Sequence, residues 1–110
     1  MPEPLAAFPD VDHGDRALVA RHQRTVRSIP DISVADLVYE YRTQFHRDPL
    51  VDRDETAYYL SVRPHVWAEF AERMDLGDAE LSRLKAAHED QFAASVGTPP
   101  ENEAMILTRE

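Results

Sequence analysis

The chain has no cysteine, three glycines and a single lysine, Lys85, among its 110 residues. Without cysteine, disulfide bonds, thiolate metal sites and a cysteine nucleophile are excluded. Three glycines are too few for a phosphate-binding loop, and neither a Gly-x-Gly-x-x-Gly nor a Walker pattern occurs. No stretch approaches the roughly twenty apolar residues of a membrane helix, and residues 1–4 do not resemble a signal peptide. We therefore expect a cytoplasmic protein that does not cross a membrane.

Charge is strongly unbalanced, because twenty-one acidic residues accompany only twelve basic ones and give a formal net charge of −9. An acidic, lysine-poor surface stays hydrated where salt screens ordinary charge repulsion, so the bias predicts adaptation to a salt-rich cytoplasm. A GC-rich genome, whose codons favour arginine, alanine and the acids over lysine, is the alternative interpretation. The same negative charge argues against a general nucleic-acid or anionic-membrane binder.

Four amphipathic patterns indicate helices, each bounded by residues that start or stop helices. Pro30 and Gly77 end the first and third helices, and Pro64 opens the third. Ser33 and Asp78 cap the second and the fourth. The predicted helices cover about 15–29, 33–47, 64–76 and 78–96. Their apolar stripes predict a core made of Leu37, Tyr41, Phe45, Val66, Trp67, Phe70, Leu81, Leu84 and Phe92.

Residues 57–62 fit a strand better than a helix, because Tyr58, Leu60 and Val62 share one side only when the chain is extended. The other short β-like run is 104–108, and we expect it to pair with 57–62, within the chain or across a dimer. The sequence therefore predicts a mainly α fold, a four-helix small domain with a short two-stranded β element, with α+β as the alternative class. The chain divides into an irregular N-terminal arm at 1–14, a helical domain at 15–96, and a Pro-containing linker with an apolar C-terminal segment at 97–110.

The run from Ala57 to Phe70 carries a resemblance. Its sequence, AYYLSVRPHVWAEF, resembles small haloarchaeal proteins of unknown function. The similarity covers about a third of the chain and implies no activity and no site residue. It supports the prediction of salt adaptation.

Positive charge is concentrated on the first predicted helix. Arg16, Arg21, Arg24 and Arg27 lie on the side opposite its apolar stripe. Such a helix can bind phosphate or anionic lipid, so these arginines form a candidate anion-binding surface. Alternatively they neutralise acidic residues of the same chain or of a partner. The net charge argues against both nucleic acid and a membrane, so neutralisation is the favoured interpretation, with nucleic acid ranked second and a membrane third.

Histidines occupy two kinds of position. His22 and His88 lie within apolar stripes, so they are expected to be buried and hydrogen-bonded. If the two stripes meet, the imidazoles could instead share a proton or a metal ion. His65, Glu69 and Glu72 share the outer face of the third helix, where a solvated surface is expected over half of a metal site.

Aromatic and apolar residues supply the candidate interaction surface. Tyr39 lies well away from the apolar centre of its helix, and Tyr59 is expected to point outward from its strand. Met105, Ile106 and Leu107 are consecutive large apolar residues near the end of a polar chain. Such a patch is usually covered, by the same chain or by a partner.

These patterns favour a non-catalytic protein-interaction or regulatory module without a cofactor or a metal ion. The expected partner is another protein or a second copy in a homodimer. A DNA-binding regulator that uses the basic first helix is the alternative, and a small enzyme is the third. Serines lack a nucleophile-elbow pattern, and carboxylates are too abundant to be diagnostic of acid–base catalysis.

Overall fold

The computed structural model describes residues 3–44 and 48–109. Within these ranges the chain forms a small α+β domain with four α-helices, which is the number predicted, and a three-stranded sheet. A short 3-10 helix, η1, covers His13–Asp15. The α-helices are α1 (Arg16–Arg27), α2 (Val34–Gln44), α3 (Pro64–Met74) and α4 (Asp78–Val96). The strands are β1 (Leu50–Arg53), β2 (Ala57–Val62) and β3 (Glu103–Thr108).

The sheet is antiparallel, with the order β1-β2-β3. Strand β2 matches the predicted strand, and it pairs along its whole length with β3, from Ala57 opposite Thr108 to Val62 opposite Glu103. The predicted pairing of the C-terminal segment is therefore confirmed, and it occurs within the chain. The C-terminal segment belongs to the same core as the helices that precede it.

Strand β1 is the element that the sequence prediction missed, so the two-stranded β element is corrected to three strands. It has only four residues, and two of them, Asp52 and Arg53, are charged. Leu50 is half-buried and Val51 is exposed, and the pairing with β2 shifts register between Leu50 and Asp52. A strand without an alternating apolar face gives no period-two signal in the sequence.

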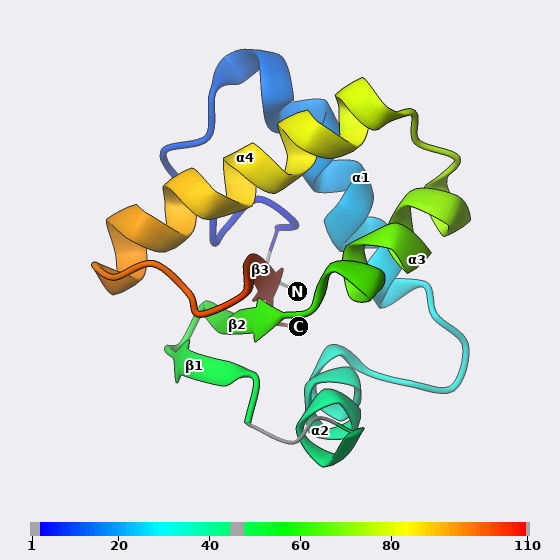
Figure 1. The fold of residues 1–110 in the computed structure, drawn as a ribbon, viewed down its shortest axis with the longest axis vertical. Helices are drawn as coiled ribbons and strands as arrows, with labels where there is room; N and C mark the ends of the chain where they lie inside the picture. Colours follow the sequence, from blue (N-terminus) through cyan, green and yellow to red (C-terminus); the bar gives the residue numbers. More distant parts are fainter. Residues whose placement is uncertain (1–2, 45–47, 110) are drawn as a thin grey trace.

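Helices α1, α3 and α4 lie together, whereas α2 lies at the opposite margin of the molecule (Figure 1). Among the predicted core residues, Tyr41 and Leu81 are half-buried, and Phe45 lies outside the described residues. The others are buried as predicted: Leu37, Val66, Trp67, Phe70, Leu84 and Phe92. The N-terminal arm also contributes to the core, because Phe8 is only 1% exposed.

Helix ends follow local chemistry with one correction. Ser33 caps α2 as predicted: its Oγ accepts from the Asp36 N–H at 3.1 Å, and its own N–H donates to the Asp36 carboxylate at 3.3 Å. Gly97 follows α4 with a φ of 90°, a left-handed geometry that favours glycine. Helix α3, however, ends at Met74 with Asp75 as its C-cap at a φ of 56°, so Gly77 does not end it. Gly77 is instead the N-cap of α4, the position predicted for Asp78, which is the first residue of the helix.

Candidate functional site

Strand β3 forms an outer edge of the sheet, and side chains from the helices pair with that edge. Alternate residues of an antiparallel strand turn their backbone groups away from the neighbouring strand. In β3 these are Ala104, Ile106 and Thr108, which we call the β3 edge. Gln23 of α1 pairs with two of them, because its Nε2 donates to the Ile106 carbonyl at 2.8 Å and its Oε1 accepts from the Thr108 N–H at 2.7 Å. The Gln23 amide therefore takes the place of a neighbouring strand.

The other two helices of the cluster complete this pairing. Trp67 of α3 donates from its indole Nε1 to the Ala104 carbonyl at 3.1 Å. The Ile106 N–H donates to Nδ1 of His88, on α4, at 2.9 Å. Both side chains are buried. An open strand edge invites pairing with other chains, and here one side chain from each of α1, α3 and α4 prevents it.

His22 and His88 meet in the core, as their positions in two apolar stripes suggested. Their ring centroids lie 5.1 Å apart, and the Trp67 ring lies 4.9 Å from one and 4.8 Å from the other. Both are fully buried. Burial lowers the pKa of His22 to about 3. Burial, and secondarily the charge of His22, lower the pKa of His88 well below its ordinary value. Both rings are therefore neutral at neutral pH.

The hydrogen bonds also assign the proton positions on the two rings. Nδ1 of His88 accepts from a backbone N–H, so its proton lies on Nε2. Nε2 of Gln23, which is a donor, lies 3.2 Å from Nδ1 of His22, so this ring is protonated on Nε2 as well. A neutral imidazole binds a metal through its unprotonated nitrogen. That nitrogen already accepts a hydrogen bond in both rings, so a shared metal ion does not fit this arrangement.

The four arginines of α1 fall into two groups. Arg21 donates to a backbone carbonyl at the end of α3, and Arg27 donates to the Arg109 carbonyl at 3.3 Å. These two side chains connect α1 to other parts of the chain. Arg16 and Arg24 are exposed, so anion binding by α1 remains a prediction that rests on this second pair.

Tyr59 does not face outward as predicted, because only 5% of it is exposed. Its ring lies edge-to-face with Phe92 of α4 at 6.2 Å, and its hydroxyl donates to Asp54 at 2.8 Å. The prediction assumed that one face of the strand contacts solvent. Strand β2 is the central strand, however, and all of its residues are buried. Tyr59 is therefore a core residue of this structure.

Asp54 organises the turn between β1 and β2 and escaped the sequence analysis. Its Oδ1 accepts from the N–H groups of Thr56 and Ala57, each at 2.8 Å, and its Oδ2 accepts from Tyr59. Burial raises the pKa of Asp54, but the hydrogen bond from Tyr59, the two backbone hydrogen bonds and the charge of Arg109 outweigh that effect and hold it below its ordinary value. The signal was an Asx-turn pattern, in which aspartate accepts from the backbone two residues on.

Met105, Ile106 and Leu107 are fully buried within their own chain, so the same chain covers them, which is one of the two alternatives that the sequence left open. Pairing of β3 with β2 covers them without a partner subunit. A homodimer built through another surface stays a prediction.

The second surface of interest is the face of α2, by which we mean the two adjacent hollows that border this helix. A hollow of about 630 Å³ lies between α2 and α3. Buried and half-buried apolar side chains form its floor, and exposed carboxylates stand at its rim. We call it the α2 groove, and it is lined by Ile29, Ile32, Leu37, Glu40, Tyr41, Gln44, Glu69, Phe70, Glu72 and Arg73.

A second hollow of about 710 Å³ borders α2 and the loop before it, and we call it the Tyr39 hollow. Tyr39 is 67% exposed, as predicted for an aromatic residue outside the apolar stripe. Ile29, Ile32 and Glu40 line both hollows, so the two are adjacent. The remaining lining residues of the Tyr39 hollow are Pro30, Asp31, Asp36 and Thr43.

Tyr41 reports the electrostatics of the α2 groove. Burial and the charge of Glu69 raise its pKa to about 12, against the opposing charge of Arg73. The charge of Glu40 also contributes to this rise. A phenol becomes harder to ionise where the local potential is negative. The carboxylates on both sides of the groove therefore act on its interior as well as on its rim.

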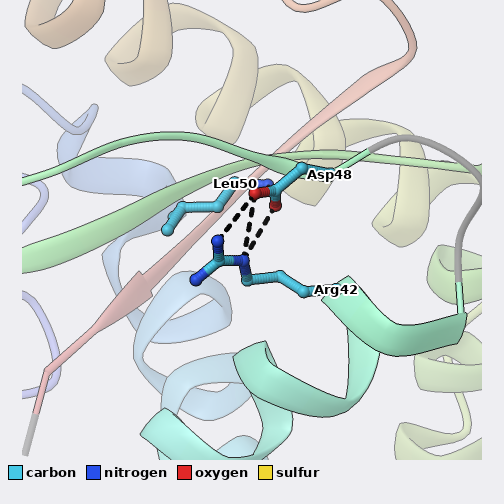
Figure 2. Close-up of polar contacts among 3 residues, drawn as sticks. All are labelled: Arg42, Asp48 and Leu50. Atoms are coloured by element: carbon cyan, nitrogen blue, oxygen red, sulfur yellow. Dashed lines mark hydrogen bonds and ion pairs between the residues drawn. The ribbon is translucent and has the colours of Figure 1, made fainter.

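Few contacts hold α2 in place. Arg42 pairs with Asp48 through Nε, at 3.0 and 3.1 Å from the two carboxylate oxygens, and Asp48 also accepts from the Leu50 N–H at 3.0 Å (Figure 2). The Arg42 and Asp48 side chains are 45% and 48% exposed, so this ion pair contributes only about 0.2–1 kcal/mol. Among the described residues, three buried apolar side chains in the first half of α2 and the half-buried Tyr41 pack against the core.

His65, Glu69 and Glu72 are exposed on α3, as predicted. In residues 3–44 and 48–109, no three side chains of the metal-binding types come together to hold an ion. None of the helices in these ranges is long and apolar enough to span a membrane.

Gln23 is the residue of the β3 edge that sequence reasoning passed over. It lies beside His22 on α1, between the buried positions Val19 and Val26. A polar pair in the middle of an apolar stripe indicates a buried hydrogen-bond network. The sequence could not identify its partner, because the Ile106 and Thr108 backbone groups are more than eighty residues away.

Together, these features define a small α+β domain with a three-stranded sheet, one edge of which is closed by helix side chains. A family model described as "Domain of unknown function (DUF8048)" matches residues 10–109, and the chain belongs to that family. The matched range includes all the helices and strands named above, and therefore both the β3 edge and the face of α2. No curated protein and no solved structure matched the chain.

Proposed function

We propose that the chain is a non-catalytic protein-interaction module that binds its partner through the face of α2. The observation that carries this proposal is Tyr39, which is 67% exposed and lines a hollow that adjoins the α2 groove. Tyrosine is enriched among the residues that dominate binding energy at protein interfaces. A grouped exposed aromatic and apolar surface is typical of an interaction site.

The buried polar residues support a non-catalytic role. Gln23 and Trp67 pair with the backbone of the β3 edge through the side-chain amide and the indole N–H, and His88 does so through Nδ1. A general acid or base must reach a substrate, whereas these side chains are buried. In the part of the chain that the structure describes, the Nε2 atoms of His22 and His88 are also buried, and they have no hydrogen-bond partner.

The test is an unbiased selection of binding peptides from a displayed library, followed by NMR mapping of each selected peptide on the full chain. We expect the shifted resonances to cluster on Ile32, Tyr39 and Tyr41. Tyr39→Ala should weaken binding by about tenfold or more. Val51→Ala is the matched control, because Val51 is also a large exposed hydrophobic residue and lies on β1. Peptides that map away from α2, with Tyr39→Ala neutral, would refute the proposal.

DNA binding by α1 is the second candidate, and the exposed pair Arg16 and Arg24 favours it. The net charge of −9 repels phosphate at long range, so we expect weak duplex binding. Fluorescence polarisation with duplex DNA decides the ranking. Tight, salt-sensitive binding that Arg16→Glu with Arg24→Glu abolishes would place DNA first.

The acidic composition belongs to the same proposal. We infer that the chain works in a salt-rich cytoplasm, as in the haloarchaeal proteins that residues 57–70 resemble. Apolar contacts at the α2 face retain their strength in salt, whereas contacts between exposed charges weaken.

A further inference from the structure

We propose that the partner segment is basic: a peptide stretch with one bulky apolar side chain that enters the α2 groove and with arginine or lysine on both sides of it. This inference rests on the proposed function, and it adds the chemistry of the partner. It follows from the shape, the charge and the surroundings of the groove.

The groove offers an anchor position of suitable size and polarity. Leu37 and Phe70 are buried beneath it, and Ile29, Ile32 and Tyr41 are half-buried along it. A volume of about 630 Å³ is ample for a large side chain. Binding energy at interfaces concentrates where an aromatic or aliphatic side chain fills such a pocket.

The negative charge around the two hollows favours basic residues next to the anchor of the partner. Five carboxylates and one guanidinium line the α2 groove and the Tyr39 hollow, which gives a local formal charge of −4. The carboxylates belong to Asp31, Asp36, Glu40, Glu69 and Glu72, and the guanidinium belongs to Arg73. They lie on α2, on α3 and in the loop before α2, so a partner with basic residues on both sides of its anchor can pair with carboxylates of more than one element. Complementary charge of this kind raises the association rate and excludes acidic partners.

The same charges argue against a second copy of this chain as the occupant. A two-fold contact through the face of α2 would bring its five carboxylates against the same five in the partner copy. Like charges across an interface oppose association. A basic segment gains from the field that would repel a second copy.

Three short synthetic peptides test this proposal on the full chain. Each has a central tryptophan, flanked on both sides by arginines in the first peptide, glutamines in the second and glutamates in the third. Isothermal titration or NMR titration at low salt should show the arginine peptide binding at least about tenfold more tightly than the glutamine peptide. The glutamate peptide should not bind. Added KCl should reduce the difference in affinity between the arginine and the glutamine peptide, because it screens the charges but does not weaken the apolar contacts of the tryptophan.

Matched variants separate local charge from overall charge. Glu40→Gln with Glu69→Gln removes two carboxylates from the rim, and Glu55→Gln with Glu89→Gln removes two exposed carboxylates elsewhere. Both double variants change the net charge equally. We expect the rim variant to weaken the arginine peptide about tenfold and the control to change it less than about twofold.

The outcomes distinguish this inference from the function on which it rests. Equal binding of the arginine and glutamine peptides at the α2 groove would refute the basic partner and leave the interaction module intact. Equal effects of the two double variants would refute it as well, by showing a general charge effect. A doubled mass in light scattering that Tyr39→Ala abolishes would replace the basic partner by a second copy. Failure of all three peptides to bind at millimolar concentration also refutes it, while the library selection still decides the function.

Discussion

The β3 edge and the face of α2 differ in what they leave exposed: the first covers its polar backbone groups, whereas the second leaves apolar side chains in contact with solvent. At the β3 edge, backbone groups that would otherwise be open are paired with Gln23, Trp67 and His88, and the whole arrangement is buried. At α2, apolar side chains lie beside hollows, and Tyr39 stands in solvent. The β3 edge therefore has the buried, hydrogen-bonded character of a protein interior. The face of α2 has the exposed apolar residues that are typical of an interaction surface.

This difference shows where to look for function in a chain rich in titratable residues. Histidine is the residue type of this sequence best suited to acid–base or metal chemistry. In both His22 and His88, however, the unprotonated nitrogen already accepts a hydrogen bond within the fold. The carboxylates near α2 are individually ordinary, but their distribution around an apolar groove is not required by the fold. Pairing inside a protein accounts for a polar group, whereas exposure of apolar surface requires another explanation.

Removal of β3 should have the largest effect on the stability of the protein. Truncation after Gly97 deletes Met105, Ile106 and Leu107, which are fully buried. Each such side chain contributes about 1.5–3 kcal/mol, so their combined loss is comparable with the whole stability of a small domain. Circular dichroism should show an unfolded chain. A shortened protein that melts at the temperature of the full chain would show that β3 is dispensable.

Gln23→Leu tests the edge pairing itself. The substitution leaves the Ile106 carbonyl and the Thr108 N–H buried without their partner, at about 1–3 kcal/mol each. Urea unfolding should therefore show a loss of about 2–6 kcal/mol in the free energy of unfolding. Gln44→Leu, on the exposed part of α2, is the matched control and should change stability by less than about 0.5 kcal/mol. Equal losses of stability in Gln23→Leu and Gln44→Leu would show that the β3 edge is not held more strongly than α2.

Acid should destabilise the edge through its histidines. The pKa of His22 is about 3 in the folded chain against 6.5 as its ordinary value, so the unfolded chain binds more protons between these pH values. Stability is therefore fully present above pH 6.5 and is lost as pH falls below it. The loss is up to about 1.4 kcal/mol per pH unit for each buried histidine. Unfolding measured from about pH 7 to about pH 5 checks this slope. It should persist in the control His13→Gln, an exposed site, and decrease in His22→Phe.

How much the sequence predicted follows from the range of the interactions involved. The starts of the helices at Ser33 and Pro64 were predicted because capping and proline effects are local. Burial of His22 and His88 followed from helical periodicity. The helix end at Asp75 was not predictable, because a left-handed aspartate has the weaker signal when a glycine lies two residues on.

The candidate site was less predictable than the fold. Tyr39 was placed correctly, because exposure on an isolated helix follows from its angle on the helical wheel. Tyr59 was misplaced, because a strand covered on both faces requires knowledge of its neighbours. The α2 groove combines α2, α3 and a loop, and no local pattern reports the space between elements that are distant in the sequence.

Salt should produce the smallest effect, and mainly on the acidic surface. Screening relieves repulsion among exposed carboxylates, so the melting temperature should rise between dilute buffer and concentrated KCl. The hydrogen bonds of the β3 edge are buried and should not respond. A melting temperature that stays constant or falls would favour GC-rich codon usage as the origin of the composition.

Native-state hydrogen exchange compares the two regions most directly, because it measures the opening free energy of each amide. The Ile106 and Thr108 amides, which donate to His88 and Gln23, should exchange only when the whole chain unfolds. The Val38 and Tyr41 amides of α2 should exchange through local opening, at a free energy at least about 2 kcal/mol lower. Equal protection in the two regions would contradict the account, because α2 would then be as firmly held as the closed edge of the sheet.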